Sequence, residues 1–215
     1  MKHLKALICA LALCGSGLAL AESEFSIYGG SQTTPHSTVT GADGRSFYTS
    51  WQGVSFEMPV YYGLRYTDWV GGDWGYAVNF THAKAKANPV ERSAGGYSVL
   101  EFTDGANPLT VMALRRFDAM ESGLRPYVGA GLGVTFPHVE VQKSSPANAP
   151  KTFGYQYGGP ALTAAAGFNY PINDQWNLMT EFQVHYLKFD VRVDGGRLKT
   201  NLVTNAINIG AVYRF

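Results

Sequence analysis

Apolar residues alternate with small or polar residues along the last segment of the chain. One parity holds Ile207, Ile209, Ala211, Tyr213 and Phe215, and the other holds Asn208, Gly210, Val212 and Arg214. Because successive side chains of a strand point to opposite faces, this period of two predicts a strand with one apolar face. A strand of this kind that ends in an aromatic residue is typical of a transmembrane β-barrel, in which one face meets lipid.

The same alternation, bounded by turn residues, predicts eight strands. Their approximate ranges are 24–36, 54–68, 74–86, 101–117, 125–141, 159–170, 176–193 and 201–215. Three turns are short, whereas the other connections are longer and more polar, namely 38–52, 87–100, 142–158 and 194–200. Outer-membrane barrels have short periplasmic turns and long external loops. The sequence therefore predicts an all-β fold, an eight-stranded antiparallel transmembrane β-barrel of the cell outer membrane.

Two further features bear on this barrel. Aromatic residues flank the short turns and predict a periplasmic girdle: Tyr66, Trp69, Trp74, Phe117, Tyr127, Tyr170, Trp176, Tyr213 and Phe215. Eight strands enclose a lumen that side chains can fill, so we expect no wide pore. A soluble lipocalin-type barrel is the alternative fold, but it would turn its apolar residues inward. The glycine and polar residues on the predicted inner face favour the membrane form.

The N-terminal residues predict a cleaved signal peptide. Lys2 and Lys5 precede an apolar stretch that ends in Ala19-Leu20-Ala21, a small-residue cleavage site. Alternatives are a membrane-anchoring helix, for which the stretch is short, and lipoprotein cleavage before Cys14. We therefore expect a signal peptide at 1–21 and one barrel domain at 22–215.

Composition excludes several classes of site. Without Lys2 and Lys5, 15 of the 17 basic residues remain against 16 acidic ones, a net charge of −1, so nothing indicates a nucleic-acid partner. Cys9 and Cys14 both lie in the segment removed, so the mature chain has no thiol or cysteine metal site. The glycines of 129–133 are not followed by a helical pattern, and no Gly-x-Ser-x-Gly motif occurs. We expect no nucleotide cofactor.

Titratable residues gather at the external ends of the predicted strands. If Phe117 lies opposite Leu124, then Glu101 lies opposite Glu140, and a cluster forms at the top of the fourth and fifth strands from Glu101, Thr103, Asp104, His138 and Glu140. If Asp68 lies opposite Trp74, then His82 lies opposite Val60, with Glu57 and Lys84 nearby.

The strand parity assigns faces to the histidines. His82 and His138 follow Phe80 and Phe136 on the outward parity, so we expect them at the head-group depth of the outer leaflet. His185 shares the inward parity with Glu181 and belongs to a predicted interior polar network, in which Arg65, Arg116 or Arg214 satisfies the acid.

Several segments at the strand tops resemble the lipid A oxidase family of outer-membrane proteins. The most particular are Phe56-Glu57-Met58-Pro59, Thr81-His82-Ala83-Lys84, Glu101-Phe102-Thr103-Asp104-Gly105 and Pro137-His138-Val139-Glu140. The likeness spans nearly the whole mature chain. It implies an enzyme that oxidises the proximal glucosamine of lipid A to 2-aminogluconate with dioxygen. The resemblance also leads us to expect an acid at position 79, where this chain has Asn79.

This reaction constrains the site. Removing two electrons from a sugar hemiacetal requires a redox partner, and imidazole and carboxylate ligands suit iron or copper. The candidate catalytic residues are His82, Glu101, Asp104, His138 and Glu140, with His82 and His138 as metal ligands. Glu57 and Lys84 are the candidate substrate-binding residues, the lysine by pairing with phosphate.

Two other functions fit the same sequence. A non-catalytic small outer-membrane barrel would serve adhesion or envelope integrity, and a lipid A hydrolase would release an acyl chain. His185 is followed by Tyr186-Leu187 and has no serine two residues on, which departs from the barrel-type lipid A deacylase. In each case the expected partners are the membrane and lipopolysaccharide, and we expect a monomer.

Overall fold

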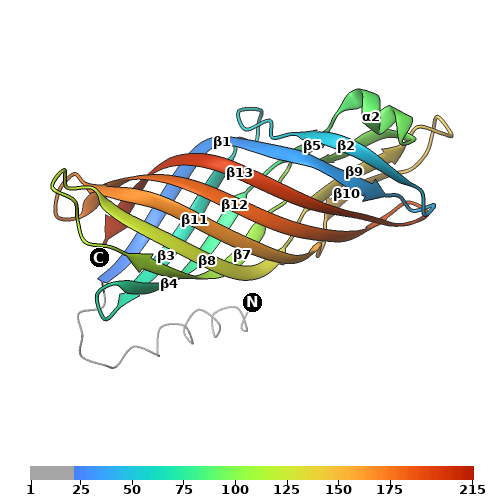
Figure 1. The fold of residues 1–215 in the computed structure, drawn as a ribbon. Coiled ribbons are helices and arrows are strands. Elements are labelled where there is room, and N and C mark those ends of the chain that lie inside the picture. Colours follow the sequence, from blue (N-terminus) through green and yellow to red (C-terminus); the bar gives the residue numbers. More distant parts are fainter. Residues whose placement is uncertain (1–21) are drawn as a thin grey trace, which may run out of the picture.

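Thirteen strand segments and one short helix make up the part of the chain that this computed structural model describes, residues 22–215 (Figure 1). The predicted signal peptide lies outside the described residues. The elements are β1 (Glu22–Thr40), β2 (Ser46–Gln52), β3 (Tyr62–Val70), β4 (Trp74–His82), β5 (Ala85–Ala87), α2 (Pro89–Ala94), β6 (Tyr97–Phe102), β7 (Pro108–Arg116), β8 (Arg125–Thr135), β9 (His138–Lys143), β10 (Lys151–Tyr155), β11 (Gly159–Pro171), β12 (Trp176–Val193) and β13 (Gly196–Arg214).

Eight of these strands close into a barrel. The antiparallel ladder runs β1-β13-β12-β11-β8-β7-β4-β3, and β3 pairs in turn with β1. The ring is completed by eight ladder partners from Glu22↔Trp69 to Gly29↔Tyr62. The predicted fold class, an eight-stranded antiparallel barrel, is confirmed. The turns β3–β4, β7–β8 and β11–β12 lie with the C-terminus at one end of the molecule (Figure 1).

The remaining short strands extend the barrel at its other end. Strand β2 pairs with β1 and β5, β6 pairs with β5 and β9, and β9 pairs with β10. Helix α2 lies at this same end (Figure 1) and begins where the Asn88 side chain accepts a hydrogen bond from Val90 N at 3.0 Å. No helix among residues 22–215 is long and apolar enough to cross a membrane.

On β12 the inward side chains change from mostly polar to apolar, and the outward ones from mostly apolar to charged, part-way along the strand. Up to Tyr186 the inward positions are Asn177, Met179, Glu181, Gln183 and His185, and the outward ones include Leu178, Phe182 and Tyr186. Above Tyr186 the inward positions are Leu187, Phe189, Val191 and Val193, and the outward ones are Lys188, Asp190 and Arg192. We call the two parts the lower barrel and the upper barrel. Along β12 the lower barrel has a mostly polar interior and an apolar exterior, and the upper barrel has an apolar interior and a charged exterior.

Aromatic and aliphatic side chains fill the upper barrel. Phe102 packs edge-on against Phe189 with ring centroids 4.8 Å apart, and Trp51 packs against Phe102 at 5.9 Å. Leu100 and Leu202 complete the same fully buried cluster. These side chains occupy the lumen, as expected for eight strands, and leave no wide pore.

A hydrogen-bonded network fills the lower barrel. Arg65 binds Glu181 through both terminal nitrogens, at 2.6 and 2.9 Å, and its Nε donates to Asn79. Tyr127 donates to the same carboxylate at 2.8 Å, and His185 contacts Gln183 at 2.9 Å. The predicted interior network is therefore present, and Arg65 is the partner of the buried acid.

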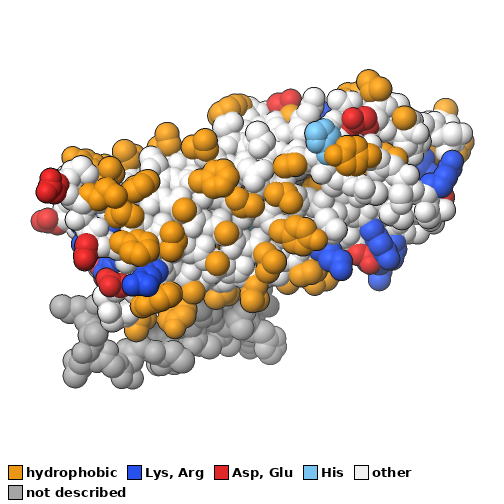
Figure 2. Space-filling model, viewed as in Figure 1, with side chains coloured by type: hydrophobic (Ala, Val, Ile, Leu, Met, Phe, Trp, Pro, Cys, Tyr) orange, Lys and Arg blue, Asp and Glu red, His pale blue; other side chains and the backbone are white. Residues whose placement is uncertain are grey.

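The exterior of the lower barrel carries an apolar belt. Figure 2 shows hydrophobic side chains spread over β8, β11, β12 and β13, with the charged side chains gathered toward the two ends. Exposed belt residues on these strands include Val128, Leu132, Leu162, Phe168, Leu178, Phe182, Ile207 and Ile209. A surface of this kind requires an apolar environment, because exposed apolar patches of this extent are rare on soluble monomers.

Three expectations about the strands were wrong. Residues 54–61 form a loop instead of the first half of a strand, and β2 and β10 lie within connections expected to be irregular. Loop 54–61 carries alternating apolar residues that imitate a strand, but its residues have no ladder partner, and pairing with β1 and β4 begins only at Tyr62. Strands β2 and β10 are short, with seven and five residues, and carry polar residues beside their few exposed aromatic ones, so the pattern of a membrane-spanning strand misses them.

The expected register was also wrong in the lower barrel. His82 pairs with Tyr62 and not with Val60, because the chain reverses within residues 71–73, where Gly71 and Gly72 adopt positive φ. Two members of the predicted girdle, Trp69 and Tyr127, point into the lumen. Trp69 stacks beneath the Arg116 guanidinium at 4.4 Å, so it serves the interior and not the surface.

Candidate functional site

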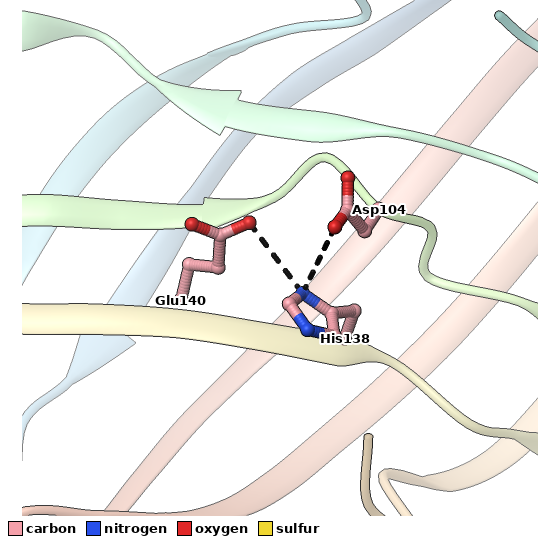
Figure 3. Close-up of side chains that lie close together, drawn as sticks. All are labelled: Asp104, His138 and Glu140. Atoms are coloured by element: carbon pink, nitrogen blue, oxygen red, sulfur yellow. Dashed lines mark ion pairs between the residues drawn. The ribbon is translucent and has the colours of Figure 1, made fainter. Parts of the chain in front are cut away.

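A cluster of one histidine and two carboxylates lies on the outer wall at the base of the upper barrel. His138 and Glu140 project outward from β9, because Val139 and Val141 occupy the inward parity and are buried in the core. Asp104 reaches them from the bend between β6 and β7 (Figure 3). We call Asp104, His138 and Glu140 the outer-wall cluster. One potential ligand atom from each lies within 4.8 Å of the others.

The spacing within the outer-wall cluster suits a metal ion. His138 Nδ1 lies 3.6 Å from Asp104 Oδ2 and 3.4 Å from Glu140 Oε1 (Figure 3). This nitrogen is buried and makes no hydrogen bond. Two ligand atoms, each about 2.1 Å from a tetrahedrally coordinated ion, lie about 3.4 Å apart. The His138 nitrogen therefore stands at the separations from the two carboxylates that a shared cation would give, and it makes no hydrogen bond.

A bend between β6 and β7 brings Asp104 to this place. Ladder partners change from Glu101↔Glu140 to Pro108↔Thr135 across it, so this strand holds two residues more than its neighbour over the same rise. Gly105 and Asn107 take positive φ values of 101° and 48° within the bend. The Asn107 amide donates to the carbonyls of Asp104, Gly105 and Phe136 and holds the bend closed.

The two extra residues in this bend also explain why the predicted pairing of Glu101 with Glu140 is correct although the predicted pairing at the turn is not. Glu101 does lie opposite Glu140, although the pairing near the turn differs from the expected Phe117–Leu124 by two residues. The two extra residues of the bend cancel that offset. Glu101 is therefore a cross-strand neighbour of the outer-wall cluster, as the sequence indicated.

Aromatic rings and a lysine fix the cluster. The imidazole of His138 packs edge-on against Phe153 and Tyr155, with centroids 4.5 and 4.7 Å away. Lys151 Nζ binds Glu140 Oε2 at 2.8 Å and leaves Oε1 toward His138. All three neighbours come from β10, the strand that the sequence reading missed. Its alternation of lysine and aromatic residues, 151–155, was the available signal.

A second ionic group lies beside the cluster. Lys86 Nζ stands 3.9 Å from Glu101 Oε2 and 3.6 Å from Glu57 Oε2. Burial raises the pKa of the Glu101 carboxyl, and the neighbouring Glu140 raises it further, against the opposing effect of Lys86. Glu101 therefore holds a proton at a higher pH than an exposed glutamate does.

The structure does not bring His82 into the outer-wall cluster. Its ring stacks on Tyr62 with centroids 5.3 Å apart, and its Nδ1 lies 3.1 Å from Asn107 Oδ1. His82 Nε2 is buried and has no hydrogen-bond partner. As expected, both His82 and His138 occupy outward positions on their strands, and Tyr155 both lines the groove that contains His82 and packs against His138.

Lys84 and Glu57 are neighbours, as expected, but Lys84 contacts the Glu57 backbone, and the Glu57 carboxylate faces Lys86. The Lys84 side chain is fully buried, and its Nζ donates to the backbone carbonyls of Glu57 and Pro59 at 2.7 and 2.8 Å. The ammonium group is thereby covered by loop 54–61. The lysines that remain open toward the cluster are Lys86 and Lys151, about one-third exposed each.

A groove runs along the outer wall next to the cluster. It has a volume of about 430 Å³ and apolar walls formed by Tyr62, Phe80, Phe136 and Tyr155. His82 and Asn107 supply its polar lining. Tyr155 separates the groove from His138, so one side chain borders both sites.

Comparison with known proteins decides the family. The family model for the outer membrane protein beta-barrel domain matches residues 6–215. The chain belongs to this family. The crystal structure of Neisserial surface protein A is similar, with a TM-score of 0.51 and 16% identity, over 93% of this chain and 100% of that one. OprG from Pseudomonas aeruginosa gives a TM-score of 0.48 and 15% identity over 91% and 94%. No curated protein sequence matches the chain.

Membership of this family places the chain in the Gram-negative outer membrane, as the sequence predicted. The apolar belt is therefore its lipid contact. On β12 and β13 that contact ends between Tyr186 and Lys188 and between Val203 and Asn201, where outward apolar residues give way to polar ones. The outer-wall cluster lies on the upper barrel, outside this belt.

This boundary gives a testable difference between two positions of β13. We expect Ile207→Lys to lower the free energy of unfolding by about 2–4 kcal/mol, because it places a cation against acyl chains. Asn201→Lys, on the same face but above the belt, should change stability by less than about 1 kcal/mol. Urea unfolding of the barrel in lipid vesicles measures both. Equal losses at the two positions would contradict the boundary.

Proposed function

We propose that the protein is a lipid A-modifying oxidase of the outer membrane and that the outer-wall cluster is its active site. The substrate is the proximal glucosamine of lipid A, and the product is 2-aminogluconate. The observation that supports this most directly is the set of three potential ligands on the outer wall, in which His138 Nδ1 lies 3.6 Å from Asp104 Oδ2 and 3.4 Å from Glu140 Oε1. The resemblance of the strand-top segments to lipid A oxidases supplies the reaction.

The donor set fits a transition metal. One imidazole nitrogen and two carboxylate oxygens would hold iron or copper, with His138, Asp104 and Glu140 as ligands. The ion would supply the one-electron steps that dioxygen requires and that amino-acid side chains cannot provide. Glu101, next to the cluster, is the acid–base group, since its raised pKa lets it take the proton of the anomeric hydroxyl.

The overall reaction balances with dioxygen and water. The C1–H and O–H bonds of the hemiacetal break, and two electrons and two protons pass to dioxygen, which leaves as hydrogen peroxide. The resulting lactone adds water at its carbonyl carbon and opens to the aldonic acid. The lipid therefore gains one oxygen atom in total.

Placement on the outer wall suits a substrate that stays in the membrane. A lipid whose acyl chains lie against the belt carries its sugars to the level of the upper barrel. Lys86 and Lys151 are partly exposed beside the cluster and can pair with phosphate. An active site in the lumen would be closed to such a lipid, because the upper barrel is filled by its core.

Mass spectrometry of lipid A tests the proposal. Cells that produce the protein should contain lipid A heavier by one oxygen, and cells that lack it should not. Purified protein should contain iron or copper by metal analysis. Loss of an acyl-chain mass would indicate the hydrolase instead, and an unchanged lipid A together with absent metal would leave the non-catalytic barrel.

A further inference from the structure

Loop 54–61 presents large apolar side chains that no part of the protein covers. Phe56 and Met58 are 78% and 83% exposed, more than the residues of the lipid-facing belt. The loop leads directly into Tyr62, at the top of β3 and on the outer wall. Apolar side chains this exposed call for an apolar environment.

The loop is held in a fixed form. Lys84 Nζ donates to the carbonyls of Glu57 and Pro59, and Ser55 Oγ accepts from the backbone N–H of Gln32 at 2.8 Å. A buried ammonium group bound only to loop carbonyls stabilises that one conformation, because releasing it would leave a charge without partners. The loop is thus a preorganised wall and not a free connection.

Loop 54–61 borders the groove beside the outer-wall cluster. Pro59 lines the groove together with Tyr62 and Phe80, and His82 at its polar end has an unpartnered Nε2. The apolar lining continues the lipid-facing belt, and the polar end leads past Tyr155 to His138. The order from apolar to polar to charged matches a lipid from acyl chain to amide or ester to sugar phosphate.

We infer that the groove binds one acyl chain of an anionic outer-leaflet glycolipid, and that loop 54–61 is inserted in the leaflet as its wall. The lysines Lys86 and Lys151 favour an anionic head group, which selects lipid A over a zwitterionic phospholipid. The choice of lipid A rests on the proposed function, whereas insertion of the loop does not. Lys84 is here a positioning residue, since it acts through the loop.

Spin labels test the insertion. The described part of the chain, residues 22–215, contains no cysteine, so Met58→Cys and Val90→Cys each introduce one label there. Val90, on helix α2, is the matched control, because it is an equally exposed apolar residue, 77% exposed, on the upper barrel. In lipid vesicles, position 58 should collide with oxygen and be shielded from a water-soluble nickel chelate. A label at 58 as accessible to the chelate as one at 90 would overturn the insertion.

Photo-crosslinking tests the occupant. Benzoylphenylalanine at Phe136, in the groove, is compared with the same residue at Phe182, which is a belt residue outside the groove. In vesicles where lipid A is a minority component, adducts at 136 should be enriched in lipid A about tenfold over those at 182, the ratio that 1.4 kcal/mol of preferential binding gives. Tyr155 is a second groove position if the first variant does not fold.

The outcomes separate this inference from the proposed function. Lipid ratios at 136 equal to those at 182, or enrichment in phospholipid, would overturn the acyl-chain site. The crosslinking is carried out in His138→Ala protein, so it does not depend on catalysis. Selective crosslinking with an unchanged lipid A mass in cells would retain the groove and reject the oxidase.

Discussion

Replacing His138 by Ala should abolish both metal binding and the gain of oxygen by lipid A. His138 supplies the single nitrogen of the outer-wall cluster, and its Nδ1 has two carboxylate oxygens at 3.4 and 3.6 Å and no hydrogen bond. Without it, Asp104 and Glu140 retain only oxygen ligands, which suit magnesium or calcium better than iron or copper. We expect metal content to fall to background and the modified lipid to be reduced at least about 1,000-fold, equivalent to ~4 kcal/mol.

The matched control for this variant is His36→Ala. His36 stacks on Tyr48 at 5.3 Å and lies outside the outer-wall cluster, so its loss should leave metal content and lipid A unchanged. Metal analysis and lipid mass spectra are collected on both variants. Full modification by His138→Ala protein, or equal loss in both variants, would contradict the assignment of the active site.

Replacing Arg65 by Met should destabilise the barrel by about 3–5 kcal/mol. The Arg65 guanidinium is buried in the lower barrel and forms two hydrogen bonds with Glu181, at 2.6 and 2.9 Å. Methionine fills most of the volume but leaves the carboxylate with Tyr127 as its remaining donor. Removing one partner of a buried ion pair leaves an uncompensated charge, which is the costly case.

Two further variants separate this effect from a general loss of packing. Arg65→Met combined with Glu181→Leu should recover most of the stability, because no unpaired charge remains. Arg197→Ala breaks an exposed pair with Asp190 and should cost less than about 1 kcal/mol. Unfolding in urea, followed by heat-dependent gel mobility, gives the three values. A double variant no more stable than Arg65→Met would mean that the ion pair is not the source of the loss.

The alternation of inward and outward positions along the strands predicted part of the candidate site. His138 and Glu140 share an outward parity with Phe136, and the structure places both on the outer wall. The alternation could not predict the contact of Asp104 with His138. That contact depends on two extra residues in the bend and on positive φ at Gly105 and Asn107. Lys151 was missed for a related reason: it lies on β10, whose pairing with β9 creates the contact.

Loop 54–61 shows the limit of pattern reading. Its alternating Phe56, Met58 and Val60 predict a strand as well as any true strand of this chain. Whether such a segment forms a ladder depends on a partner with free backbone groups. Here β1 turns to pair with β2 above Thr33, and the loop is left to bind Lys84 instead.

The sequence by itself determined the class of fold, the membrane, the outward strand positions of His82 and His138 and the inward position of His185. It could do so because eight segments with an alternation of two can turn an apolar surface to lipid and satisfy their backbone hydrogen bonds only as a closed β-barrel. Only the tertiary structure decided which groups meet. Register, a surplus of two residues at one bend, and the change from a polar to an apolar interior above Tyr186 depend on contacts between strands far apart in sequence. Those contacts brought His138 to Asp104 and left His82 with Asn107.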